Sequence, residues 1–166
     1  MTAIRPNQPQ TARSLARLAA TQALYQMLLA GTTAEDVVAE FRNFRGMNET
    51  EGSTLTGADQ ALFADIVRGA CARQDEIETL LSECLAQDWP LARLETTLRA
   101  VLWAGAYELL ARPDIPLEVV INEYVEIAHA FFAEKEPAFV NGVLDRLAHK
   151  VRPSTPEAAA GGGSTR

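Results

Sequence analysis

The sequence predicts an all-helical fold of about seven helices, arranged in two small sub-bundles. Long stretches rich in Leu, Ala, Glu and Arg repeat their apolar residues every three or four positions, and proline is nearly absent from them. No alternating β-branched run bounded by turn residues occurs, so strands are not expected. The stretch 94–111 has apolar residues on nearly every side of a helix and must therefore be covered nearly all round. We interpret it as the central helix.

The first helix is expected to begin after Thr11, a good N-cap, and to run to Ala30. Gly31 is expected to end it, because glycine adopts the left-handed conformation that closes many helices. Residues 1–10 are polar and contain prolines, which predicts a disordered N-terminus.

On this helix Arg13 and Arg17 are four residues apart and share one face. The opposite face is expected to carry Leu15, Leu18, Gln22, Tyr25 and Leu29. The arginines occupy only the first two turns, so we expect the helix to begin at the protein surface and to end inside.

Thr33 is expected to cap a short second helix that reaches about Phe44. The segment 45–57 is rich in Gly, Ser, Thr and Asn and reads as a loop. It is the expected boundary between sub-bundles of about 11–57 and 58–152, which together form one domain.

Residues 59–85 keep a long helical pattern with an expected break near 73–75, and Trp89-Pro90 interrupts it before the central helix. Within that helix, Gly105 is costly unless a neighbouring backbone passes close to it. Two further helices are expected at 117–132, capped by Asp114, and at 138–151, opened by Pro137. The low-complexity tail 153–166 is expected to be flexible.

The net charge of −7 is unevenly distributed. Residues 1–34 hold three arginines and no acid, residues 35–134 hold seven basic and 19 acidic side chains, and residues 135–166 hold five basic and three acidic ones. Because surface charges act over only about 8 Å at physiological salt, a basic patch built from the two ends would attract phosphate despite the overall negative charge.

The composition points to a reducing cytoplasm. Cys71 and Cys84 form no CxxC or CxxH motif, so we expect packed thiols. No apolar run reaches the roughly 18 residues that span a bilayer. An alternative interpretation of the acid-free N-terminus is a mitochondrial presequence, but it contains only three arginines and continues without a break into the core pattern.

The sequence shows no catalytic motif. A GxSxG elbow and the glycine-rich phosphate loops are missing, so we predict no enzyme activity and no cofactor. Glu126 and His129 form one ExxH pair, but a di-iron site needs two such pairs facing inward, and this pair is expected to face outward. His149 lies near a helix C-terminus, where a cation favours the helix dipole, so no metal site is predicted.

Basic and aromatic residues remain as the candidate chemistry. Arg13 and Arg17 lie near the positive end of the first helix, a favourable place for phosphate. Aromatic rings surround the charged turn before the last helix, and an exposed ring there stacks a base for about 1 to 3 kcal/mol. The aromatic residues are Phe131, Phe132 and Phe139, and the basic residue Lys135 lies among them. By themselves these residues are more simply explained as ordinary surface and core.

Four segments, in order, resemble the NusB family of transcription antitermination factors. The last helix, AFVNGVLDRLAHKVRP at 138–153, is similar to the C-terminal signature of that family. The other segments are ARSLARLAATQALYQML at 12–28, RAVLWAGAYELL at 99–110 and IPLEVVINEYVEIAHAF at 115–131.

The resemblance implies an all-helical NusB-like domain without catalysis. It implies binding to the boxA element of nascent RNA, chiefly of ribosomal RNA operons, together with a small-subunit ribosomal protein that acts as NusE. This pair joins the elongating RNA polymerase with other Nus factors in the bacterial cytoplasm and suppresses termination.

The resemblance also assigns site residues. The expected RNA-binding residues are Arg13, Arg17, Lys135, Phe139, Asn141 and Arg146. The expected NusE-facing residues, which include an apolar docking strip on the central helix, are Tyr25, Leu98, Arg99, Leu102 and Trp103. The basic strip from the chain's beginning is expected to share one exposed patch with the last helix.

Two positions depart from the family pattern. Ser14 and Leu15 stand where further arginines are common, and Lys135 stands where an acid is often found. Two other functions fit the sequence in part. NusB-like domains also precede ribosomal RNA cytosine methyltransferases, which would need a couple of hundred more residues, and a helical protein-interaction adaptor without RNA binding remains open. The sequence also leaves open whether the protein is a monomer or a homodimer.

Overall fold

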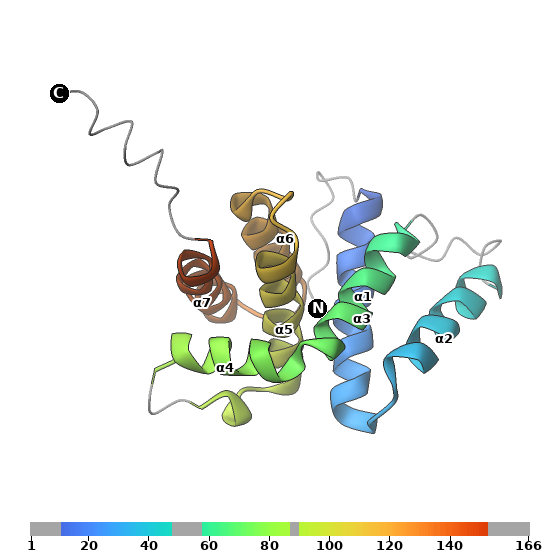
Figure 1. Ribbon diagram of the computed structural model, residues 1–166, viewed down its shortest axis with the longest axis horizontal. Coiled ribbons are helices and arrows are strands. Elements are labelled where there is room, and N and C mark those ends of the chain that lie inside the picture. The colour runs from blue at the N-terminus through green and yellow to red at the C-terminus, as the bar shows by residue number, and fades with distance from the viewer. Residues whose placement is uncertain (1–10, 48–57, 87–89, 153–166) are drawn as a thin grey trace.

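Seven α-helices and one short 3-10 turn make up the part of the chain that the structure describes, and this part contains no strand (Figure 1). The structure is a computed structural model that describes residues 11–47, 58–86 and 90–152, without the side chains of residues 42–47. The predicted disorder at 1–10, most of the predicted loop, Trp89 and the predicted flexible tail lie outside the described residues. The all-helical prediction is confirmed.

The seven α-helices of the described residues are 11 to 19 residues long. In chain order they are α1 (Ala12–Ala30), α2 (Ala34–Met47), α3 (Gln60–Ala72), α4 (Gln74–Cys84), the 3-10 turn η2 (Leu91–Arg93), α5 (Thr96–Ala111), α6 (Leu117–Phe131) and α7 (Lys135–Val151).

Local capping sets several helix ends. The side chain of Thr11 accepts a hydrogen bond from the backbone N–H of Ser14, and Gly31 ends α1 with a φ of 73°. Asp59 caps α3 through the N–H of Leu62, and the predicted break near residues 73–75 falls at Arg73, between α3 and α4. These boundaries confirm the predictions.

One predicted cap and one predicted helix start are wrong, whereas α6 begins at Leu117 as expected. Pro116, not Asp114, occupies the N-cap position of α6, and Asp114 accepts hydrogen bonds from Arg112 instead. The last helix begins at Lys135, which places Pro137 at the third helical position rather than the first. Proline is tolerated there because the first four N–H groups of a helix have no intrahelical partner.

α5 is the central helix, as predicted. It packs against α1, α3, α4, α6 and α7. Figure 1 shows it between α7 on one side and α1 with α3 on the other. At Gly105 an added Cβ would lie 2.9 Å from Leu144 Cδ1, so the close neighbours are side chains of α7 and α6 rather than a backbone.

The buried face of α1 differs from the predicted one. Its core residues are mostly small, namely Ala16, Arg17, Ala19, Ala20, Thr21, Ala23 and Leu24. Small side chains allow α5 to approach α1 closely, whereas Gln22 and Leu29, which were expected on the face opposite the arginines, are exposed. The helix therefore ends at the surface, contrary to the expectation.

α2 lies at the edge of the molecule, where it packs mainly against α3 and also against α1 (Figure 1). The predicted division into two sub-bundles stays a prediction, because α1 and α3 pack both against each other and against α5.

Candidate nucleic-acid and partner surfaces

A charged network lies at the centre of the helix bundle. Arg17 of α1 donates from Nε to Oε2 of Glu108 over 2.7 Å and from Nη2 to Oε1 over 3.1 Å. The hydroxyl of Tyr124, on α6, donates to the same Oε2 over 2.6 Å. Arg17 is 2% exposed and Glu108 is 0% exposed, so this network joins three helices in the interior of the bundle.

The ionisation of these groups follows from their mutual distances. Burial opposes the charge of Arg17, but the hydrogen bond and Coulomb attraction of Glu108 outweigh it and raise the guanidinium pKa above its usual value. Burial and the adjacent Glu108 carboxylate raise the pKa of Tyr124 well above its usual value. The phenol therefore stays a hydrogen-bond donor.

The expectation that Arg17 lies beside Arg13 on an exposed face is therefore wrong. The face that packs against α5 includes Arg17, and a guanidinium held by two carboxylates inside the bundle has no surface left for a phosphate. Arg13 is exposed at the start of α1. It lies near the α5–α6 turn, where it adds to the lowering of the Asp114 pKa that hydrogen bonds from Arg112 cause.

α7 carries the other residues expected to bind RNA. Lys135, Asn141 and Arg146 are exposed and Phe139 is half-buried. Arg146 uses Nε to donate to the backbone oxygen of Cys84 at the end of α4, over 3.0 Å. Its position is therefore partly fixed by the fold.

Among the described aromatic residues Phe131 is the most exposed, with 43% of the residue accessible to solvent. It ends α6, a few residues before Lys135. α6 packs against both α1 and α7 and lies between them (Figure 1). Because α6 lies between α1, which carries Arg13, and α7, a patch shared by Arg13 and the last helix has to extend across α6 (Figure 1).

The central helix offers no exposed docking strip. Leu98 and Leu102 are buried, and Trp103 is 6% exposed, with its indole N–H donating to the backbone oxygen of Ala70 over 2.9 Å. The structure therefore corrects the expectation for these three residues. Tyr25 and Arg99 are half-buried and remain reachable from the surface.

An acidic groove of about 730 Å³ opens beside Arg99. It is lined by Asp75, Glu78, Thr79, Ser82, Glu83, Pro90, Leu91, Ala92 and Arg99. Nη2 of Arg99 lies 3.9 Å from Oε2 of Glu78, so the carboxylates of α4 outnumber the cation. A neighbouring recess joins Arg99 to Leu28, one turn after Tyr25 on α1. α1 thus reaches both candidate surfaces, since Arg13 and Tyr25 are separated by roughly 18 Å of helix.

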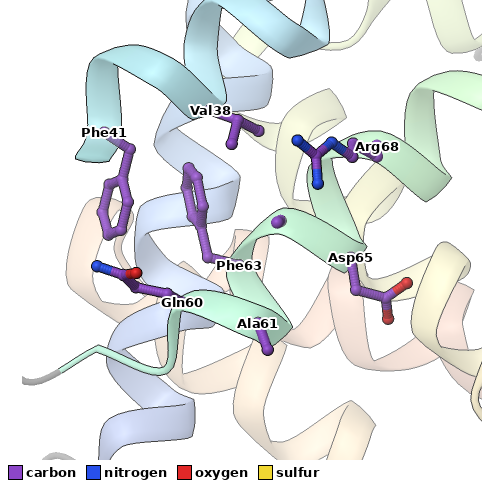
Figure 2. A pocket seen from close by; sticks show the side chains of 8 residues that line it. Val38, Phe41, Gln60, Ala61, Phe63, Asp65 and Arg68 are labelled. Carbon is purple, nitrogen blue, oxygen red and sulfur yellow. The ribbon is translucent and has the colours of Figure 1, made fainter. Parts of the chain in front are cut away.

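Figure 2 shows a second groove, of about 540 Å³, between α2 and α3. The rings of Phe41 and Phe63 stack there with centroids 3.9 Å apart. Arg68 and Glu35 form an exposed ion pair between the two helices, with Nε 2.8 Å from Oε2.

Sequence reasoning missed the central role of Glu108, and it did not identify Arg152 as a cap. Arg152 donates to the backbone oxygens of Glu108, Leu109, Arg112 and Ile115 at distances of 2.6–3.2 Å, and so caps the C-terminal end of α5. One signal was available for Glu108: a lone carboxylate in a helix that is apolar nearly all round requires a buried cation.

The described part of the chain holds no group of three or more His, Cys, Asp or Glu side chains placed to bind a metal. Within the same part, no helix is both long enough and apolar enough to cross a membrane. What the described residues present are surfaces: basic and aromatic positions around α6, and an acidic groove along α4. They define an all-helical binding protein.

Comparison with known proteins gives the family. A model described as the NusB family matches residues 14–149. The chain is 51% identical over 149 residues to the Transcription antitermination protein NusB of Brucella suis (strain ATCC 23445 / NCTC 10510), which covers 89% of this chain and 87% of the relative. The chain therefore belongs to the NusB family.

Solved structures agree in fold. NusB of T. maritima superposes with a TM-score of 0.65 at 33% identity, over 87% of this chain and 96% of the other. A NusB chain from the crystal structure of antitermination factors NusB and NusE in complex with dsRNA superposes with a TM-score of 0.67, over 82% and 96% of the two chains. At 22% identity, the second likeness concerns the fold alone.

Proposed function

We propose that this chain is a transcription antitermination factor that binds boxA RNA of ribosomal RNA operons together with a small-subunit ribosomal protein acting as NusE. The observation that carries the proposal is 51% identity, over 89% of the chain, to a protein named for transcription antitermination. A protein of the same fold has been crystallised with NusE and double-stranded RNA. In the bacterial cytoplasm the pair joins the RNA polymerase elongation complex with other Nus factors.

The proposed RNA surface runs from the start of α1 across α6 to α7. Arg13, Lys135 and Arg146 supply exposed positive charge, and Asn141 supplies an exposed amide. Phe131 offers the exposed ring for base stacking, whereas Phe139 is half-buried. Arg17 acts from inside the bundle by holding α1 against α5 and α6, and does not touch RNA.

The proposed NusE surface lies on the other half of α1. Arg99 lines the acidic groove, and a neighbouring recess lined by Arg99 and Trp103 reaches Leu28, one turn after Tyr25. Leu98 and Leu102 are buried on the same helix as Arg99. A basic ribosomal protein fits there because carboxylates of α4 outnumber cations. Two proteins that each contact the same RNA raise the effective concentration of the second contact, which compensates for the few phosphate contacts that this chain offers.

The decisive experiment is to mix the protein, the ribosomal protein and boxA RNA and to measure the mass of the species formed. We expect a complex of all three, and a gel shift of the RNA that strengthens when the ribosomal protein is added. A two-protein complex that leaves boxA RNA unbound would instead support the alternative, a helical adaptor without RNA binding. A scrambled RNA of equal length is the control.

A further inference from the structure

A continuous set of polar contacts connects the exposed start of α1 to the buried charges. Oγ1 of Thr11 donates to Oγ of Ser14 over 2.9 Å, and Oγ of Ser14 donates to Oε1 of Glu123, on α6, over 2.8 Å. The same Oε1 lies 3.6 Å from Nη1 of Arg17, whose other nitrogens hold Glu108. The N-cap of α1 is thus connected, through one carboxylate, to the centre of the bundle.

Glu123 pairs with Arg17, but its charge lies beside the start of α1, where phosphates are proposed to bind. Its side chain is 26% exposed and contacts Ser14 in the first turn of α1, so its negative charge opposes the approach of phosphates to that end of the helix. Ser14, for its part, stands where the family resemblance leads one to expect a further arginine. The Ser14 hydroxyl donates a hydrogen bond to the Glu123 carboxylate without adding a charge to α1. The first turn of α1 stays at the surface.

We propose that Ser14 and Glu123 are positioning residues for RNA binding. Their hydrogen bond fixes the first turn of α1 against α6, and with it the backbone of Arg13 and the free N–H groups of the helix start. A surface fixed before binding loses less conformational entropy when the RNA binds. The proposal rests on the proposed function and concerns residues that do not themselves touch the RNA.

A double-mutant cycle tests this. The dissociation constant for boxA RNA, with the ribosomal protein present, is measured for the wild type, Ser14→Ala, Glu123→Ala and the double variant. We expect each single change to weaken binding about 3- to 10-fold, because one hydrogen bond to a charged group is lost. The double variant should bind no more weakly than the weaker single variant, since both changes remove the same contact.

Glu118→Ala is the matched control, since it removes the same charge from α6 at an exposed position with no hydrogen bond to α1. It should leave RNA binding unchanged or strengthen it. Glu123→Gln, which still accepts a hydrogen bond from Ser14, should bind RNA at least as tightly as the wild type. Thermal melting of every variant separates these effects from a general loss of stability.

Additive effects in the cycle would overturn the proposal, as would a gain of affinity in Glu123→Ala equal to that in Glu118→Ala. Weak binding by Glu123→Gln at an unchanged melting temperature would also overturn it. If the wild type binds the RNA and the cycle is additive, only the positioning role fails. If the wild type with its ribosomal partner does not bind boxA RNA at all, both the positioning role and the proposed function fail.

Discussion

Arg17 and Glu108 form a two-point ion pair at the centre of the bundle, with Nε 2.7 Å from Oε2 and Nη2 3.1 Å from Oε1. The two residues are 91 positions apart in the chain, and both are almost completely buried. The pair stabilises the contact between α1 and α5 only while both members are present, because an isolated charge in the same place has no water to solvate it.

We therefore predict that Arg17→Ala lowers the free energy of unfolding by about 3–5 kcal/mol, because it leaves the Glu108 carboxylate without its cation. Urea denaturation followed by circular dichroism measures the change. Arg68→Ala is the control, since it removes the exposed pair with Glu35 and should have little effect. A similarly small effect of Arg17→Ala would show that water reaches Glu108.

Stability at high pH should depend on Tyr107. Burial first, and then the hydrogen bond to Asp65 over 2.7 Å, raise the pKa of Tyr107 to about 12. A tyrosine in the unfolded chain titrates near pH 10. Its contribution is therefore complete below pH 10 and is lost as the pH rises from 10 towards 12.

The measurement is the free energy of unfolding at pH 8, 10 and 11 for the wild type and Tyr107→Phe. The variant should start lower at pH 8, because it lacks the bond to Asp65, and should lose less stability between pH 10 and 11. Parallel losses in the two proteins would contradict the assignment to Tyr107.

Arg152 should stabilise the fold from the end of α7. Its guanidinium donates to four backbone oxygens around the end of α5, and Arg152→Ala leaves them without these donors. We expect a loss of about 1.5–3 kcal/mol in the free energy of unfolding. Arg152→Lys should recover only part of it, because an ammonium keeps the charge but not the planar set of five donors. Full recovery with lysine would mean that charge alone matters.

Tyr25 and Trp103 should separate partner binding from stability. Trp103→Ala removes a buried ring and its hydrogen bond to Ala70, so we predict a loss of about 3–5 kcal/mol in the free energy of unfolding. Tyr25→Asp changes a half-buried side chain and should weaken association with the ribosomal protein with much less effect on melting. Titration calorimetry with the ribosomal protein and a thermal melt of each variant decide this. If a fully folded Tyr25→Asp variant bound the ribosomal protein normally, Tyr25 would not belong to the proposed NusE surface.

Arg13→Ala should weaken RNA binding and reduce its salt dependence. Each phosphate contact contributes about −0.7 to the slope of log affinity against log salt for a single strand. Removing Arg13 should make that slope shallower by about 0.7, the contribution of one phosphate contact, while the melting temperature stays the same. An unchanged slope would place Arg13 outside the RNA surface. Arg93→Ala, at an exposed arginine of η2, is the control.

The helices could be predicted from sequence because their boundaries depend on neighbouring residues. Thr11, Gly31 and Asp59 act within one turn of where they stand, and each boundary they mark was confirmed. Asp114 was assigned to the wrong role because an arginine two residues earlier competes for its carboxylate. Local patterns do not say which of two local partners wins.

The position of Arg17 could not be predicted, because a helical wheel compares the residues of one helix only. Arg13 and Arg17 share a face by spacing, yet the alanines around Arg17 bring α5 close, and Glu108 there supplies the opposite charge. Leu98, Leu102 and Trp103 were correctly placed on the central helix but wrongly expected to reach the surface, because the coverage of a helix by its neighbours is a property of the whole fold.

The four bonds of Arg152 also bear on how the chain reaches its native state at the ribosome. Arg112, at the end of the central helix, leaves the peptidyl-transferase centre 40 residues before the arginine that holds it. At bacterial elongation rates of about 5–20 residues per second, this interval is roughly 2–8 s. During that interval the end of α5 lacks the four hydrogen bonds that Arg152 supplies, so this cap forms only after α6 and α7 have been synthesised.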